Sequence, residues 1–181
     1  MTVSGEEYNI CDKASKGDNF WGNSKPGAYG AGLGRTLNDP YKPARTGMLG
    51  QMAYGKLLNE PVDILYRQGG DEYDTKLGNL KVDIKCAMRN YGCGLVYHQN
   101  EWGKTVPLNK DLFIFSHIAN EDRQNQSCDV VFMGAATSTH IKKCPIRRGR
   151  KGRGHKNYEV SYQTLLPMQR FISLSSKLRK I

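Results

Sequence analysis

The chain has 181 residues, which fits a single domain. Its 27 Lys and Arg residues outnumber 17 Asp and Glu residues, giving a net charge of +10 that favours a polyanionic partner, with nucleic acid first. No stretch approaches the roughly 18 apolar residues of a membrane span, so we expect no membrane association. The five cysteines are odd in number and lack CxxC spacing, which argues against a disulfide scaffold and predicts reduced thiols in a cytoplasmic protein.

Residues 1–46 are predicted to form an irregular N-terminal arm, because they are rich in glycine and carry no sustained apolar periodicity. The run Gly30–Arg35 lacks the preceding apolar strand and the Gly-Lys-Ser/Thr ending of a phosphate-binding loop, so we interpret it as a surface loop. Aromatic side chains in the arm either pin it to the domain or stack on bases. They are Tyr8, Phe20, Trp21, Tyr29 and Tyr41.

A helix is predicted over residues 47–59. Its apolar residues fall on one stripe, at Met48, Leu49, Met52, Leu57 and Leu58. Thr46 is a candidate N-cap, and the helix is expected to end before Pro61, because a residue that precedes proline avoids helical geometry. The next segment, residues 62–66, is interpreted as a short strand or a linker.

A β-hairpin is predicted around Gly78-Asn79, because a glycine-containing dipeptide between two alternating runs is typical of a two-residue turn. Counting from this turn pairs Leu77 with Leu80, Thr75 with Val82 and Asp74 with Asp83. One face of the hairpin is then apolar, with Tyr73, Thr75, Leu77, Leu80, Val82 and Ile84.

The other face of this hairpin sets Asp74 against Asp83, and directly opposed carboxylates repel each other. Lys85, on the same face, supplies part of the compensating charge, and a divalent cation between the carboxylates would supply the rest. A solvated hairpin with scattered charges remains the alternative.

The rest of the chain predicts further strands and short helices, which together indicate a mixed α/β fold around one sheet. The expected strands are 95–97, 111–115, 128–133 and 158–162, of which 111–115 is nearly all apolar and therefore central; a helix is expected to start at 137–141, and another segment, 164–171, is expected to be interrupted at Pro167.

These elements resemble the PD-(D/E)xK nuclease superfamily, over about residues 47–170. Gly50-Gln51-Met52-Ala53 is similar to the family's helix signature, Asp74 to its first acid and Asp83-Ile84-Lys85 to its (Asp/Glu)-x-Lys strand. The apolar strand 112–115 and the segment from Val130 to Gly134 follow in the family's order. The resemblance implies a restriction-endonuclease-like mixed central sheet flanked by helices, as a nuclease domain over residues 47–181.

The resemblance also implies a metal-dependent site. Mg²⁺ or Mn²⁺ would be bound by Asp74, Asp83 and the carbonyl of Ile84, and Lys85 would orient the attacking water, leaving a 5′ phosphate. Gln51 would position a second water or metal, but the family usually has Glu at this position. Either two carboxylates suffice, or Asp71 or Glu72 replaces the missing acid, or activity is weakened.

A basic segment over residues 142–156 is expected to contact phosphates, with glycines that indicate a loop. Its basic residues are Lys142, Lys143, Arg147, Arg148, Arg150, Lys151, Arg153 and Lys156, and no acid lies among them. A solvated loop or a localisation tag is the alternative interpretation. His98 and His117 flank predicted strands and are expected to be structural.

Together these observations predict a metal-dependent deoxyribonuclease, more specifically an endonuclease, with DNA as its partner and no small-molecule cofactor. The resemblance implies that a homodimer is possible, and a short basic nuclease of this kind suits a phage or mobile element. Two other functions remain open: a weakened nuclease fold that binds DNA or RNA without cutting, and a basic structural or assembly protein.

Overall fold

The computed structural model describes residues 1–16, 41–62, 73–99, 103–148 and 156–178. Its helical elements are α1 (Glu6–Lys16), α3 (Lys42–Leu58), α4 (Ser138–Ile141), the 3-10 helix η2 (Tyr162–Thr164) and α5 (Met168–Leu178). Its strands are β1 (Thr2–Ser4), β2 (Thr75–Leu77), β3 (Leu80–Ala87), β4 (Cys93–Gln99), β5 (Leu112–Asp122), β6 (Ser127–Thr137), β7 (Ile146–Arg148) and β8 (Lys156–Ser161).

The strands form two sheets. The larger sheet has the order β1-β6-β5-β3-β2, in which β3 and β5 run parallel and the other neighbours are antiparallel. The smaller sheet, β4-β8-β7, is antiparallel. The apolar strand β5 occupies the centre of the larger sheet, as its sequence predicts, because its first seven residues are all buried.

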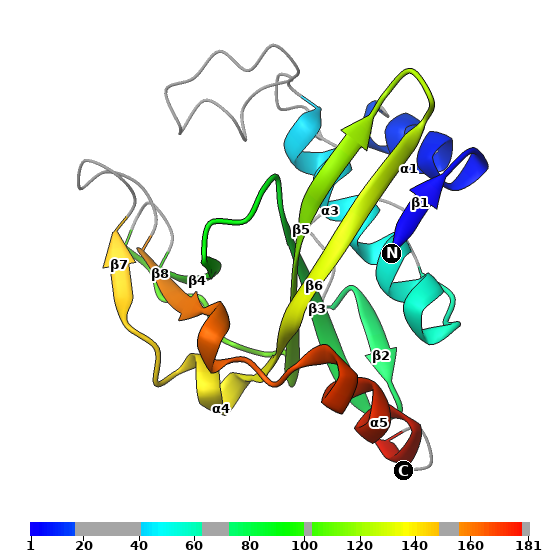
Figure 1. The fold of residues 1–181 in the computed structure, drawn as a ribbon. Coiled ribbons are helices and arrows are strands. Elements are labelled where there is room, and N and C mark those ends of the chain that lie inside the picture. The colour runs from blue at the N-terminus through cyan, green and yellow to red at the C-terminus, as the bar shows by residue number, and fades with distance from the viewer. Residues whose placement is uncertain (17–40, 63–72, 100–102, 149–155, 179–181) are drawn as a thin grey trace.

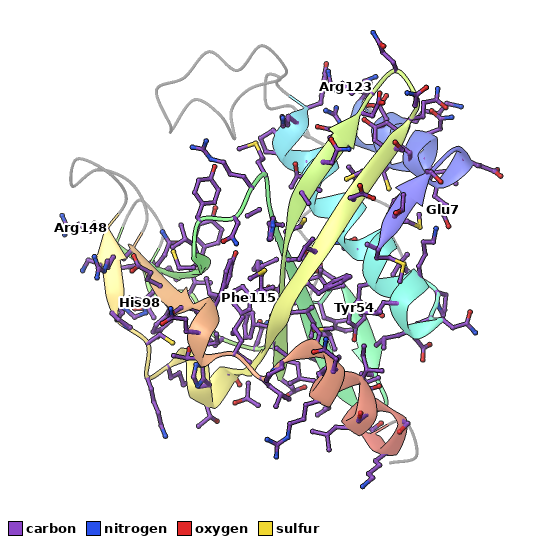
Figure 2. The ribbon with its side chains drawn as sticks, viewed as in Figure 1. Glu7, Tyr54, His98, Phe115, Arg123 and Arg148 are labelled. Carbon is purple, nitrogen blue, oxygen red and sulfur yellow. The ribbon has the colours of Figure 1, made fainter. Side chains whose placement is uncertain are left out.

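The two faces of the larger sheet have different covers (Figure 1). On one face, α3 and α5 pack with Tyr54, Leu58 and Phe171 against Val82 and Ile84. On the other face, the three-stranded sheet and α4 cover Phe113 and Phe115. Figure 2 shows Tyr54 and Phe115 on these two opposite sides. The predicted mixed α/β class is therefore confirmed, with helices flanking a mixed sheet. The expectation of one sheet is wrong, because β4, β8 and β7 pair with one another in a second sheet.

The prediction of an irregular arm over residues 1–46 is wrong at both of its described ends. β1 pairs with the edge of β6, and α1 packs Tyr8 and Cys11 into a core cluster with Leu49 of α3. The sequence hid this helix because few of its 11 residues are apolar. Of the aromatic residues in the arm, Tyr8 is pinned to the domain: it is buried, and its hydroxyl donates to Glu121.

Helix α3 also begins earlier than predicted, at Lys42, with a proline in its first turn. Proline is tolerated there because its missing N–H has no helical acceptor to lose. Thr46 is consequently a buried residue inside the helix rather than its N-cap. The helix ends at Asn59, which adopts the left-handed conformation with φ 54°, so the end precedes Pro61 as expected.

Two other boundaries differ from the predictions. β6 continues through Gly134 instead of ending there, because the glycine accommodates a bulge with φ 151° and lies against Leu165 and Leu166. Pro167 does not interrupt a helix but precedes one, since α5 starts at the next residue. The Pro167 carbonyl accepts a hydrogen bond from the Phe171 N–H in the first turn of α5. The predicted strand 95–97 lies within β4, and the predicted strand 158–162 covers the end of β8 and one residue beyond it. The helix expected to start at 137–141 is α4, with Thr137 as its N-cap.

Several predicted features lie outside the described residues: the Gly30–Arg35 run, Phe20, Trp21, Tyr29, residues 63–66, Asp71, Glu72, and the basic residues Arg150, Lys151 and Arg153. In the part of the chain that is described, none of the helices combines the length and apolar character that crossing a membrane requires.

Candidate active site

The predicted hairpin is the element that positions the acids. Its turn at Gly78-Asn79 is confirmed, with Gly78 at φ 59°, and the ladder pairs Leu77 with Leu80 and Thr75 with Val82. The ladder begins only at Thr75, so strand alternation does not extend to the two residues before it. Tyr73 is accordingly not part of the apolar core, and its ring lies against the Lys76 and Lys81 ammonium groups.

Asp74 is held beside β3 by two hydrogen bonds. Its N–H donates to the Val82 carbonyl at 2.9 Å, and its carboxylate oxygen Oδ2 accepts from the N–H of Ile84. Asp74 is therefore not the ladder partner of Asp83 that counting from the turn predicts. The hydrogen bond from Ile84 instead brings the Asp74 carboxylate to the edge of β3, one residue before Lys85.

Asp83 and Lys85 form an ion pair on the face of β3 that points away from α3. Lys85 Nζ lies 2.7 Å from Asp83 Oδ2, and Asp83 is 6% exposed. The parallel register sets these residues next to Phe113 and Phe115 of β5, whose buried rings form an apolar wall. The ammonium group is thus the counter-charge that this carboxylate needs in a largely dry environment.

The three charges influence one another strongly. Burial and the neighbouring Asp83 carboxylate raise the pKa of Asp74 to about 6, although the Ile84 N–H and the ammonium groups of Lys85 and Lys110 oppose the shift. Burial lowers the pKa of Lys85, but Asp83 outweighs burial and, with Asp74, holds it above its ordinary value. The site therefore groups two carboxylates with the Lys85 ammonium, and Lys110 adds a second positive charge near Asp74.

This donor set fits a hard divalent cation. Asp74 and Asp83 provide carboxylate oxygens, and the Ile84 carbonyl points to the Asp74 edge, because the N–H and C=O of one strand residue lie on the same side. The Asp83 carboxylate repels that of Asp74 and so contributes to its raised pKa, and a cation bound between the two carboxylates would relieve this repulsion. The described residues contain no cluster of three or more His, Cys, Asp or Glu suited to a metal.

Gln51 is the one predicted site residue that the structure does not bring to the others. It lies half-buried on α3, directly after Gly50, which packs against Cys86 and Ser116. This is the opposite face of the sheet from Asp83 and Lys85. No hydrogen bond or ion pair within the described residues joins Gln51 to Asp74, Asp83 or Lys85.

Two residues near the site, Lys110 and Tyr97, were missed by the sequence interpretation, and a third, His117, was expected to be only structural. Lys110, just before β5, acts on Asp74, and the Tyr97 hydroxyl of β4 acts on Lys85. His117 of β5 follows Phe115 by two residues and so shares the face of Lys85; it is 8% exposed, Nδ1 has no partner within the described residues, and burial lowers its pKa. The parallel β3–β5 pairing would have revealed Lys110 and His117, but it joins residues about 30 positions apart and leaves no local signal.

The basic segment is partly strand rather than a continuous loop. Arg147 and Arg148 lie on β7, which pairs with β8 from Lys156 onward, and Lys142 and Lys143 follow α4. The exposed residues among these are Lys142, Lys143, Arg147 and Arg148, and Lys156 is half-buried. Arg147 pairs with Glu159 at 3.3 Å, so this surface contains one acid that lies just beyond the acid-free run of the sequence.

The cysteines and His98 agree with structural roles. All five cysteines are free thiols. His98 Nδ1 lies 3.0 Å from the Tyr158 hydroxyl, and their rings meet edge to face. Comparison of the chain with known protein families, with curated proteins and with solved structures finds no match in any of the three.

Proposed function

We propose that the protein is a metal-dependent deoxyribonuclease with a restriction-endonuclease-like core, whose site is built from Asp74, Asp83, Lys85 and the Ile84 carbonyl. One observation carries the proposal: Asp74 reaches β3 through Ile84 N–H, so two carboxylates and an ammonium gather at one strand edge. These are the residues on which the resemblance to PD-(D/E)xK nucleases rests.

Each residue has a separate task in this proposal. Asp74 and Asp83 bind Mg²⁺ or Mn²⁺, which when bound would acidify water and offset charge on the phosphate. Asp83 also keeps Lys85 protonated and oriented through their 2.7 Å contact. The Lys85 ammonium then stabilises the negative charge that develops on the phosphate oxygens during in-line attack. Departure of the 3′ oxygen leaves a 5′ phosphate.

The substrate class follows from the charge of the chain. The net charge of +10 and the exposed cations on and near β7 favour a polyanion, and phosphate contacts of this kind give strongly salt-dependent affinity. Such contacts orient DNA without reading its sequence. Endonucleolytic cutting of both strands would require a second copy of the chain, and free thiols are compatible with a cytoplasmic site of action.

Binding without cutting is the second candidate function. It is favoured by Gln51, a neutral amide at the position where the family usually has Glu, on the far side of the sheet from the acids. Among the described residues, no third carboxylate joins Asp74 and Asp83 in a group that could hold a metal. Metal affinity would then be low, and the protein would act as a nucleic-acid-binding module.

Incubation of the protein with plasmid, single-stranded and branched DNA, in Mg²⁺, Mn²⁺ or EDTA, separates the two functions. We expect cleavage that requires the metal, that is abolished in Asp83→Ala and that is unchanged in Glu6→Gln, a control acid exposed on α1. DNA binding should persist in Asp83→Ala. Binding without cleavage under every metal supports the second function, and a gain of cleavage in Gln51→Glu would show that the missing charge limits the rate.

A further inference from the structure

The outer face of the three-stranded sheet carries features that the nuclease proposal does not use. In β4, the inward residues Gly94 and Val96 are buried, whereas Leu95 and Tyr97 are 55% and 45% exposed. Leu95 and Tyr97 therefore lie together on the outer face of β4.

Register places a row of polar and basic residues beside Tyr97. Tyr97 pairs with Asn157 of β8, and Asn157 pairs with Arg147 of the edge strand β7. Because paired residues lie on the same face of a sheet, the three side chains form a row across three strands, which we call the Tyr97 row. The Arg147 side chain is 66% exposed at the end of this row.

The outer end of the Tyr97 row lies at the edge strand β7. Figure 2 shows Arg148, the residue after Arg147, at the outer edge of the three-stranded sheet. Arg148 pairs with Lys156, and strand alternation turns both side chains to the opposite face from Arg147. Basic residues therefore occupy both faces of this edge, and a strand of phosphates that contacts Arg147 can continue over Tyr97.

We infer that the Tyr97 row binds unpaired bases of a DNA single strand, with Tyr97 as a stacking platform and Arg147 as a phosphate contact. This inference rests on the proposed function and specifies its substrate as DNA with a single-stranded segment. An exposed aromatic ring on a sheet, with a cation in the same row, suits a single strand, because every base has a π-face to stack and the cation can contact a phosphate. Duplex DNA keeps its bases stacked on one another and offers the row only its phosphates.

Glu159 sets a limit on binding that can also be tested. Its carboxylate holds Arg147 at 3.3 Å and would repel phosphate. A nucleic acid that contacts Arg147 must compete with this pair. Removal of the acid in Glu159→Gln should therefore tighten the binding of all polyanions, whereas removal of the Tyr97 ring should affect only ligands with bases available for stacking.

The test measures binding by fluorescence anisotropy in EDTA, so that metal chemistry does not enter. The probes are a single-stranded DNA, the same strand with abasic sites, its duplex and the matching RNA. We expect Tyr97→Ala to weaken binding of the intact single strand at least about fivefold, with little change for the abasic strand and the duplex. Tyr97→Phe should bind as the wild type does, and Arg147→Gln should reduce the salt slope by about 0.7 for the single strands and by about 0.9 for the duplex.

Tyr91→Ala is the matched control, because Tyr91 is 53% exposed but precedes β4 and stands outside the Tyr97 row. Equal losses in Tyr91→Ala and Tyr97→Ala, or equal losses for intact and abasic strands, would overturn the inference. RNA binding equal to that of DNA would overturn the assignment to DNA. Metal-dependent cleavage with no effect of Tyr97→Ala on binding would overturn the inference about the Tyr97 row and support the proposed nuclease. A preference for single strands that depends on Tyr97, without cleavage, would support the Tyr97 row and contradict the proposed nuclease.

Discussion

The pKa of the Asp74 carboxyl is strongly shifted by its surroundings. The fold raises its pKa to about 6, chiefly through burial and the charge of Asp83, whereas an unfolded chain leaves it near 4. Between these values the folded state binds more protons than the unfolded state, so the contribution of Asp74 to stability is present at low pH and is lost as the pH rises from about 4 to about 6.

We therefore expect Asp74→Asn to become more stable relative to the wild type over this same pH range, by roughly 3 kcal/mol, because the amide cannot ionise. The side-chain oxygen of Asn can still accept from the Ile84 N–H. Urea denaturation in EDTA, repeated from pH 4 to pH 7.5, measures the difference in unfolding free energy. A difference that does not change with pH would show that Asp74 ionises normally in the fold.

Arg45 is a second residue whose charge decides stability. Its side chain is 1% exposed and pairs with Asp12 of α1 at 3.2 Å and with Glu121 of β5 at 2.9 Å, so it joins the first helix to the sheet. Arg45→Met would leave two carboxylates without this partner, and we expect a loss of roughly 3 kcal/mol. Lys16→Met is the control: Lys16 also pairs with Asp12, but it is 51% exposed, and its loss should cost less than about 1 kcal/mol. Urea denaturation compares them, and equal losses would contradict the role of Arg45.

At the scale of elements, the contact between the two sheets depends on one glycine. A Cβ atom added to Gly94 of β4 would lie 2.1 Å from the Phe115 ring of β5, so the sheets could not approach as they do. We expect Gly94→Ala to lower the unfolding free energy by about 1–3 kcal/mol, as overpacking of a core does. Gly47→Ala is the matched control, because an added Cβ there meets nothing within 4 Å and alanine favours the α3 helix. Thermal unfolding should move the two variants in opposite directions, and a shift in the same direction would contradict this packing.

Elements stabilised by local contacts could be predicted from the sequence, and those stabilised by distant contacts could not. The β2–β3 hairpin has its own turn, and β5 has its own apolar run, so both were predicted with correct register or position. Helix α1 carries only a few buried residues, and its place depends on β6 and α3, which are far away in the chain. The departure of β4 into a second sheet likewise depends on its pairing with β8, about 60 residues later.

The same distinction applies to the candidate site. Asp83 and Lys85 lie two apart on one strand, so their shared face follows from alternation alone. The approach of Asp74 was predicted for the wrong reason, since a hydrogen bond to Ile84, and not strand register, brings it there. The position of Gln51 depends on which face of the sheet α3 covers, and that is decided by the packing of the whole core.

At the scale of the molecule, a chain of net charge +10 brings two carboxylates together at one strand edge. Repulsion between Asp74 and Asp83 is tolerated because Lys85 and Lys110 offset part of it. A bound cation would offset the rest and would stabilise the fold by mass action, since an unfolded chain does not bring these oxygens together. The proposed function therefore depends on whether this edge binds a divalent ion.

Titration of the protein with Mn²⁺ at pH 7.5, followed by the loss of the free-ion EPR signal, tests this most directly. We expect one bound ion per chain in the wild type and in Glu6→Gln, and none over the same range in Asp83→Asn and Asp74→Asn, with circular dichroism confirming that each variant is folded. Mn²⁺ binding that is unchanged in the folded Asp83→Asn and Asp74→Asn variants, or no binding by the wild type at millimolar Mn²⁺, would contradict the assignment of these carboxylates to a metal site.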